Sequence, residues 1–418
     1  MKLRKRLLSL VLACTLLFSA SILLFGCKDE ASANELIVFT MFGGEDPNKD
    51  AYKVGVDEFK AAHKGVELID DSVQVVGEGF DDTVTSKFIN EKYAPDVLYV
   101  FSPGRNLAIQ SKLAKVADIR KKHSDYGKGF PEVGGDPQAL AFLGNSFGIY
   151  YEKSAFADAD FASYGALKTK LKTLATSKIV DAAGETNTWL NYIGLQKMGK
   201  KWADVQIPTK SWFQDNRTDL EAVLTEMVSY MRTDLKMGSD AAIQYGNEKQ
   251  AMWNGEKSFD VNGNWNAAGF YPPHSQAGKA GNYAFRTFAI DDNPSTANVD
   301  ESKYVMSGFF HGWMISKKCF NNPERLKLAV DFVNKQCKNV LEYPGMAANG
   351  ATREDDTALA KQTKDILKAQ GAVMCSPLDD KFLDSAAKTA FFTGLTNMIL
   401  GTTTPAQVIT DTINAFIV

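Results

Sequence analysis

The chain has 418 residues, of which 44% are hydrophobic, 23% charged and 11% aromatic, as in ordinary globular proteins. This length predicts two domains or one large, divided α/β unit. Lys and Arg number 47 against 50 Asp and Glu, and no long basic run follows the first six residues, which argues against a nucleic-acid partner. The four His and five Cys show no CxxC or HxxxH spacing, so we expect no metal, no redox dithiol and no cofactor.

Residues 1–26 have the pattern of an export signal. Four basic residues lie within the first six, and an apolar stretch follows from residue 7 to residue 25. A permanent transmembrane anchor is the alternative interpretation, because about 20 apolar residues also suffice to cross a bilayer. Either interpretation places the rest of the chain outside the cytoplasm.

The signal ends at a sequence that resembles a bacterial lipobox, with Phe25 in place of the usual small residue before Gly26 and Cys27. The resemblance implies that Cys27 is diacylated and becomes the mature N-terminus, which anchors the protein to a bacterial membrane. Residues 27–34 are then a short polar tether. Without residues 1–26 the chain keeps 43 basic and 50 acidic residues, a net charge of −7.

The first part of the mature chain alternates strands and helices. Apolar runs at 35–42, 73–76 and 95–101 predict strands. Two amphipathic helices are predicted between them, with apolar faces made by Tyr52, Val56 and Phe59 and by Phe80, Val84 and Phe88. This alternation predicts a parallel sheet with helices on its faces. Ligands of such sheets bind beyond the carboxyl ends of the strands, which makes the loops 43–46 and 101–105 candidates.

The second part is mainly helical. A buried strand at 147–151 is followed by helical periodicity from about residue 164 to residue 237. Further strands are predicted at 258–265, 283–290 and 309–316, and helices at 322–333, 382–400 and 405–416. Pro at the first helical position, after Asn322 and after Thr404, marks the start of two of these helices.

Three cysteines remain beyond Cys27, and an odd number cannot all pair. Cys319 precedes the helix that begins near residue 322, and Cys337 lies at its end. At 1.5 Å per residue these two are roughly 20 Å apart, beyond the reach of a disulfide. We therefore expect Cys319, Cys337 and Cys375 to be buried structural thiols.

Five short motifs occur in the order found in one known family. Residues 59–67 are similar to its "F…hPGv.v" motif, with Lys64 at the usual Pro, and residues 94–97 to its "aPDv" motif. The others are 148–153, similar to "g.yYNk" with Glu152 for Asn; 251–255 with 263–265; and 308–316 followed by 322–333. On these motifs the chain resembles the extracellular solute-binding proteins of ABC importers, in the carbohydrate-binding family that includes maltose-binding protein.

The resemblance implies an α/β, periplasmic-binding-protein-like fold of two lobes. Each lobe would be a mixed sheet flanked by helices, and crossover hinge strands would join the lobes. The first lobe would comprise 35–147 plus 305–355, and the second 148–304 plus 356–418. The expected function is capture of a sugar between the lobes by hinge closure and its delivery to an ABC permease in the membrane. We expect a monomer that is not an enzyme.

The aromatic and polar residues support a sugar site independently. Sugars have apolar C–H faces and hydroxyl rims, so a sugar site needs flat aromatic rings beside amide, carboxylate or guanidinium groups. All six Trp lie between Trp189 and Trp313, and three of them have such a neighbour. The predicted ligand-binding residues are Glu45, Phe101, Tyr151, Trp189 with Asn187, Asn264, Trp265, His311, Trp313 and Arg353.

Each of these residues also has a structural interpretation. Trp189, Trp265 and Trp313 could be core aromatics, and Glu45 a solvated turn acid. Trp202, Trp212 and Trp253 are assigned to packing. A secreted carbohydrate-active hydrolase and an adhesive surface lipoprotein are the alternative functions. The adjacent acids Asp291–292 and Asp355–356 project apart, whereas glycosidases need two carboxyl groups that face each other.

Overall fold

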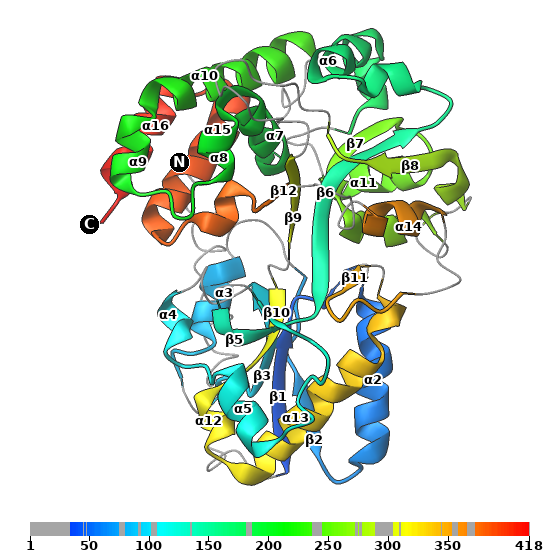
Figure 1. The fold of residues 1–418 in the computed structure, drawn as a ribbon, viewed down its shortest axis with the longest axis vertical. Coiled ribbons are helices and arrows are strands. Elements are labelled where there is room, and N and C mark those ends of the chain that lie inside the picture. Colours follow the sequence, from blue (N-terminus) through cyan, green and yellow to red (C-terminus); the bar gives the residue numbers. More distant parts are fainter. Residues whose placement is uncertain are drawn as a thin grey trace, which may run out of the picture.

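The computed structural model describes residues 34–44, 46, 48–74, 80–90, 93–101, 107–133, 136–180, 186–235, 245–271, 275, 278–288, 304–308, 311–343, 345–352, 358–365 and 373–417. They form two lobes, one above the other in Figure 1. Each lobe is built on its own sheet, and β6 (Leu143–Glu152) runs from one lobe into the other. The predicted fold class is therefore confirmed.

The lower lobe contains a sheet of six strands. Their order is β2 (Glu67–Asp70), β1 (Glu35–Thr40), β3 (Val97–Phe101), β10 (His311–Ile315), β5 (Asp136–Ala141) and β4 (Glu132–Val133). The strands β2, β1 and β3 are parallel, as the alternation of strands and helices predicts, and β10 runs antiparallel between β3 and β5. Of the strand predicted at 73–76, residues 75–76 lie outside the described residues and Gln74 makes an isolated antiparallel bridge with Phe42. The strand that pairs with β1 lies at 67–70, which was not predicted.

Helices cover both faces of this sheet. Leu36 and Val38 of β1 point to the face covered by α2 (Lys49–Ala62), α5 (Val116–Lys122) and α13 (Pro323–Lys338). Phe39 points to the other face, covered by α3 (Phe80–Ser86) and α4 (Leu107–Gln110). The short helix α12 (Lys317–Phe320) follows β10 directly. The near-continuous apolar runs of β1 and β3 follow from this burial on both faces.

The predicted start and apolar face of α13 are confirmed. Asn322 caps the helix by accepting a hydrogen bond from the backbone of Arg325, and Pro323 is its first residue. Its buried face is made by Leu326, Ala329, Val330, Val333 and Cys337, together with Arg325, Phe332 and Gln336. Cys319, Cys337 and Cys375 are free thiols, and their predicted burial is confirmed.

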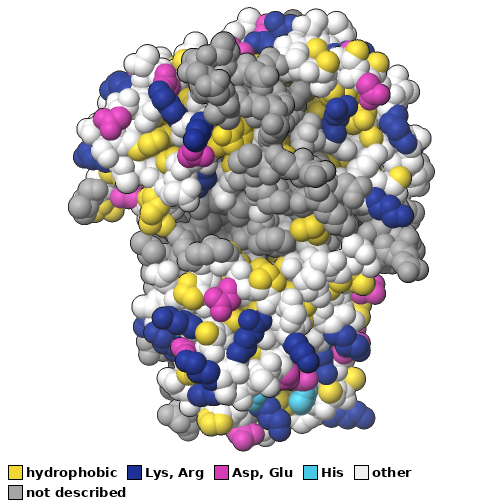
Figure 2. Space-filling model, viewed as in Figure 1, with side chains coloured by type: hydrophobic (Ala, Val, Ile, Leu, Met, Phe, Trp, Pro, Cys, Tyr) yellow, Lys and Arg dark blue, Asp and Glu magenta, His cyan; other side chains and the backbone are white. Residues whose placement is uncertain are grey.

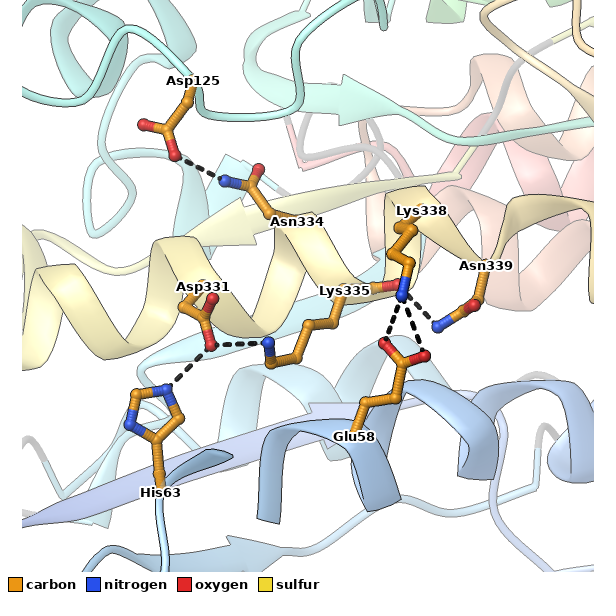
Figure 3. Close-up of polar contacts among 8 residues, drawn as sticks. All are labelled: Glu58, His63, Asp125, Asp331, Asn334, Lys335, Lys338 and Asn339. Atoms are coloured by element: carbon orange, nitrogen blue, oxygen red, sulfur yellow. Dashed lines mark hydrogen bonds and ion pairs between the residues drawn. The ribbon is translucent and has the colours of Figure 1, made fainter. Parts of the chain in front are cut away.

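The helices α2 and α13 lie side by side, and polar contacts join their solvent-facing edges (Figure 3). The Asp331 carboxylate lies 2.8 Å from His63 Nε2 and 3.3 Å from Lys335 Nζ. Lys338 Nζ lies 3.1 Å from Glu58 Oε1. A buried ion pair, Arg325 with Asp96, lies beneath α13, and Asp96 also accepts the Ile37 N–H at 2.8 Å. These contacts fix α13 against both α2 and β1.

The upper lobe is built around β6. This strand pairs with β7 (Phe259–Gly263), β8 (Tyr283–Arg286), β9 (Tyr304–Gly308) and β11 (Met346–Ala347), and β9 also pairs with β12 (Val373–Cys375). The larger helices are α6 (Tyr164–Thr173), α7 (Thr186–Met198), α10 (Arg217–Val228), α11 (Tyr245–Trp253), α14 (Ala358–Asp365), α15 (Ser385–Ile399) and α16 (Pro405–Ala415), and the short ones are α8 (Lys200–Ala203) and α9 (Lys210–Asp215). Because β9 pairs within this sheet, residues 305–308 belong with the upper lobe rather than the lower one.

Candidate functional site

The two lobes meet where β6 enters the upper sheet. Leu143 packs in the core of the lower lobe, whereas Phe147 packs in the core of the upper lobe. Beside this stretch the chain returns from β9 to β10, and the Ser307 hydroxyl donates a 2.8 Å hydrogen bond to the Asn145 carbonyl oxygen. We call residues 143–147, 307–308 and 311 the crossover. On β6, the crossover residues 143–147 therefore lie at least four residues before Tyr151.

Four of the described side chains meet around the crossover: Asn145, Asn264, Trp265 and His311. Asn145 Nδ2 lies 2.8 Å from His311 Nδ1. The amide donates to Nδ1 in the tautomer that carries the imidazole proton on Nε2. Asn264 donates to the Gly144 carbonyl at 2.9 Å and accepts the Ser146 N–H at 3.1 Å, so its amide fixes β6 at this point.

Trp265 is half-buried and stands against β6 just above these amides. Its ring makes an edge contact with Phe147, with centroids 5.1 Å apart and an interplanar angle of 84°. Gly263 supplies the space for the ring, because a Cβ on Gly263 would lie 2.0 Å from the indole. Asn264 holds the backbone that carries Trp265, so the two predicted residues act as one unit.

The lower lobe contributes Asp46, which follows β1. Its Oδ1 accepts hydrogen bonds from the backbone and the side chain of Asn48, at 2.8 and 3.1 Å, and so positions the start of α2. Burial raises the pKa of Asp46 above its ordinary value, and these hydrogen bonds and the Lys249 charge oppose that shift. Lys249 belongs to α11 of the upper lobe, so Asp46 faces a cation from the other lobe.

A group of buried aromatic rings supports this side of the crossover. Tyr99 of β3 stacks on Phe42 with centroids 4.6 Å apart, and it contacts Trp313 at 4.8 Å and His311 at 6.2 Å. Burial also raises the pKa of Tyr99 well above its usual range, so this hydroxyl stays neutral. The rings link His311, which is 7% exposed, to the core of the lower lobe.

Trp313 and Trp189, two of the predicted sugar platforms, lie in the cores. Trp313 is 0% exposed and packs among Tyr99, Phe142 and Phe332. Trp189 is 1% exposed and packs in the upper core against Tyr230, Phe259 and Phe288. A ring enclosed in this way has no free face for a sugar, so the structural interpretation of these two residues holds in this structure.

Tyr151 also lies away from the crossover. Its ring packs against Phe156 and Phe161, with centroids 5.8 and 4.5 Å away. The backbone of Tyr151 pairs with both β7 and β8, deep in the upper sheet. At about 3.3 Å per residue, it is roughly 20 Å along β6 from Asn145. The sequence motif at 148–153 therefore lies on β6, but beyond the part of the strand that forms the crossover.

Other predicted positions lie outside the described residues. These are Glu45, Arg353, Cys27 and the acids at 291–292 and 355–356, and for Phe101 only the backbone at the end of β3 is described. Asn187 lies in the first turn of α7, and its backbone carbonyl oxygen accepts a hydrogen bond from the Asn191 side-chain amide at 2.8 Å.

Asn145 is not among the residues predicted from the sequence, and Asp46 is predicted only as part of the candidate loop 43–46. Asn145 has a recognisable signal, because it is a polar residue next to Ser146 within an otherwise apolar strand. For Asp46 the signal is its position shortly before a predicted helix, where carboxylates satisfy free backbone N–H groups. No local signal indicates that His311 would meet Asn145, 166 residues earlier in the chain.

No helix among the described residues is long and apolar enough to cross a membrane. Within the same residues, no group of three or more His, Cys, Asp and Glu side chains could hold a metal ion. One pocket, of about 580 Å³, lies away from the crossover between α15 and α16, where Thr389, Thr393, Asn397 and Asp411 contribute to its lining.

The chain matches no family model and no curated protein sequence. Its fold does match solved structures. One, from work on xylan utilization by Caldanaerobius polysaccharolyticus, has a TM-score of 0.70 at 14% identity, over 91% of this chain and 99% of the other. A Streptococcus pneumoniae solute-binding protein in complex with the blood group A-trisaccharide has a TM-score of 0.67 at 14% identity, over 91% and 98%. Maltose-bound MalE3 of T. maritima has a TM-score of 0.66 at 15% identity, over 91% and 98%.

These likenesses extend over nearly the whole described chain and nearly the whole of each neighbour. They establish that the protein has the two-lobed fold of solute-binding proteins. The resemblance inferred from the short motifs is thereby confirmed at the level of the fold.

Proposed function

We propose that the protein is the extracytoplasmic receptor of an ABC importer and that it captures a sugar or oligosaccharide between its two lobes. The observation that carries this proposal is the group Asn145, Asn264, Trp265 and His311 at the crossover of a solute-binding-protein fold. The neighbours that have this fold include structures with maltose and with a trisaccharide bound.

The chemistry of this group suits a polyhydroxylated, uncharged ligand. Amides and an imidazole donate to and accept from hydroxyl groups, and a half-exposed indole can cover an apolar sugar face. Asp46, across from Lys249, adds a carboxylate that accepts strong hydrogen bonds. The proposed ligand-binding residues are therefore Asn145, Trp265, His311 and Asp46, with Glu45, Phe101 and Arg353 retained from the sequence prediction. Asn264 is proposed to position Trp265, because both polar atoms of its amide are bonded to β6.

Contacts from both lobes to one ligand favour a closed arrangement of the lobes. The lower lobe would be residues 35–143 with 311–347, and the upper lobe 147–308 with 358–417, and these would move about the crossover as nearly rigid bodies. The closed form would then deliver the sugar to the membrane permease. Binding and release need no chemical step, so we propose a binding protein, a monomer that is not an enzyme.

We further propose that Cys27 carries a lipid anchor after removal of residues 1–26. Without the lipid, the mature chain, with a net charge of −7, has no predicted hydrophobic anchor that would hold it stably on a membrane. Cys27→Ser should therefore release the protein into the soluble fraction of expressing cells. Equal membrane retention of the unaltered chain and the variant, with neither processed, would instead indicate a permanent transmembrane anchor.

Identification of the ligand tests the central proposal. Small molecules released by denaturing freshly purified protein should include a sugar by mass spectrometry, and the same sugar should raise the thermal unfolding midpoint of the ligand-free protein. Trp265→Ala should reduce this shift. A panel of mono- and oligosaccharides that leaves the midpoint unchanged, together with release of a different class of compound, would overturn the assignment to carbohydrates.

A further inference from the structure

One part of the lower lobe has a strong excess of positive charge. Residues 107–122 and 316–322 together contain seven basic side chains and one acidic side chain, Asp118. Six of the seven are lysines, and we call them the lysine surface: Lys112, Lys115, Lys121, Lys122, Lys317 and Lys318. This excess occurs in a mature chain whose overall charge is −7, so the charge distribution is strongly uneven.

The lysine surface is one continuous region of the fold. The Lys317 N–H donates to the Lys112 carbonyl oxygen at 2.8 Å, which joins the segment before α5 to α12. Lys122 at the end of α5 reaches the same helix: its Nζ lies 3.1 Å from the Phe320 carbonyl oxygen and 3.8 Å from the centroid of the Phe320 ring. Lys318 is half-buried and the other five lysines are exposed. Figure 2 shows Lys and Arg side chains gathered on the left of the lower lobe, where Figure 1 places α5 and α12.

The neighbouring surface, where α2 meets α13, differs in its charge balance. There Lys335 is paired with Asp331 at 3.3 Å and Lys338 with Glu58 at 3.1 Å, as Figure 3 shows. Within the lysine surface the only acidic residue of α5, Asp118, pairs with Lys121 at 2.7 Å. Within 107–122 and 316–322 the basic residues outnumber the acidic ones by seven to one, which gives a net positive field at this surface.

The lysine surface lies beside the point where the tether joins the folded chain. The Ile37 carbonyl oxygen accepts the Asp96 N–H at 2.8 Å, and the Asp96 carbonyl oxygen accepts the N–H of Ser316, the residue before α12, at 3.0 Å. Asp96 thus links Ile37 of β1 to Ser316. The start of α12 therefore lies close to the N-terminal end of β1. The Glu35 carboxylate, at the first residue of β1, lies within electrostatic range of Lys318. This end of the sheet points away from the upper lobe (Figure 1).

We propose that the lysine surface binds the anionic phospholipid head groups of the membrane and so holds the lower lobe against it. The proposal rests on the proposed anchoring at Cys27. Seven residues, 28–34, separate the anchor from Glu35, and a chain of this length reaches at most about 25 Å. The surface that surrounds the tether exit is therefore kept near the lipid head groups, where each lysine gains electrostatic attraction.

This contact has a consequence for the proposed receptor. The lysine surface lies at the N-terminal end of β1, whereas Asp46 and the crossover lie beyond its C-terminal end. Lipid contact at the lower end leaves the crossover accessible to a solute. The acidic remainder of the molecule is repelled by an anionic membrane, so the two effects together orient the upper lobe away from the membrane.

Vesicle co-sedimentation tests this proposal on the mature chain with Cys27→Ser, which removes the lipid from the measurement. The chain should bind vesicles of phosphatidylcholine mixed with phosphatidylglycerol more tightly than vesicles of phosphatidylcholine alone, and high salt should abolish the difference. The variant Lys115→Gln, Lys121→Gln, Lys122→Gln, Lys317→Gln should bind the anionic vesicles at least about tenfold more weakly. The matched control changes four exposed lysines of the upper lobe, Lys172, Lys178, Lys200 and Lys201, to Gln and should keep its binding.

Equal binding by the two variants would overturn the proposal, as would an absence of salt-sensitive binding to anionic vesicles. Binding to native membranes but not to pure lipid vesicles would also overturn it, in favour of an acidic protein partner. If the first variant does not fold, the salt dependence of the unaltered chain decides the question. Failure of lipidation would appear instead as release of the native protein from cells, so the two failures are distinguishable.

Discussion

Single residues at the crossover serve structure and the proposed binding together. Asn264 uses both polar atoms of its amide on the backbone of β6, and it thereby holds Trp265 in place. His311 lies between the Tyr99 ring and the Asn145 amide. Buried polar groups are stable only when they are hydrogen-bonded, so these contacts fix the orientation of the side chains before any ligand arrives.

Trp265 and Trp313 should respond differently to truncation. Trp313→Ala removes a fully buried ring and should lower the free energy of unfolding by about 3–5 kcal/mol. Trp265→Ala removes a half-buried ring and should weaken sugar binding roughly 5- to 30-fold. Chemical denaturation and calorimetric titration of both variants give the comparison. Unchanged affinity in the folded Trp265→Ala variant would assign this ring to packing alone.

Asp46→Asn should separate stability from binding. Burial raises the pKa of Asp46, so its contribution to stability is complete below the ordinary pKa of about 3.9 and is lost as the pH rises through the raised value. The Asn side chain does not ionise, so the variant does not lose stability as the pH rises through this range. It should therefore unfold at the same or a higher denaturant concentration than the unaltered protein at neutral pH. Its affinity for the sugar should fall about tenfold or more, because a charged acceptor is lost.

The control for Asp46 is the pH dependence of unfolding. The difference in stability between the unaltered protein and the Asn variant should be smallest at acid pH and should grow in favour of the variant toward pH 7. A variant that is less stable than the unaltered protein at neutral pH would show that the carboxylate stabilises the start of α2 more than its burial destabilises the fold.

At the scale of elements, β6 determines how the two sheets are connected. Its first residues pair with β11 and β9, and its last residues pair with β7 and β8. One strand therefore carries backbone hydrogen bonds at the crossover and in the centre of the upper sheet. Close contact between β6 and β8 also leaves no room for a side chain at Gly148.

Gly148→Ala should destabilise the upper lobe. The added Cβ would lie 2.3 Å from the Arg286 carbonyl oxygen, which belongs to the backbone of β8 and cannot move without disturbing the sheet. We expect a loss of about 1–3 kcal/mol in the free energy of unfolding, measured by chemical denaturation. Gly65→Ala is the matched control, since a Cβ there meets no atom within 4 Å. Equal stability of the two variants would contradict the close contact.

At the scale of the whole molecule, two hydrophobic cores are joined by few connections. Leu143 belongs to one core and Phe147 to the other, so the crossover contributes little apolar packing of its own. Two separately packed bodies joined by crossing strands are the arrangement on which hinge closure depends. This arrangement is the structural basis of the proposed closure.

Small-angle scattering should report that closure directly. Addition of the identified sugar at saturation should reduce the radius of gyration of the protein, because contacts with both lobes favour the closed arrangement. A sugar that does not raise the thermal midpoint serves as the control and should leave the radius unchanged. An unchanged radius with the bound sugar would exclude closure as the response to binding.

Local patterns in the sequence determined most of the helices and strands. The structure contains α13 with its predicted Asn-Pro start and apolar face, and β3 at its continuous apolar run. These elements could be predicted because buried positions recur in the sequence with the period of the helix or strand. The resemblance carried by short motifs correctly predicted two lobes. The strand at 67–70 was not predicted because its sequence is less apolar than the run at 73–76, although it is the strand that pairs with β1.

Only the tertiary structure decided what the aromatic and polar residues do. Trp313 and Trp265 are the same residue type in similar local sequence, yet one is enclosed by Tyr99, Phe142 and Phe332, and the other is half-exposed beside Phe147. Asn145 and His311 meet across 166 residues, at a point where two strands of different lobes pass each other. Burial and long-range hydrogen bonds depend on which elements become neighbours, and local periodicity carries no information about that choice.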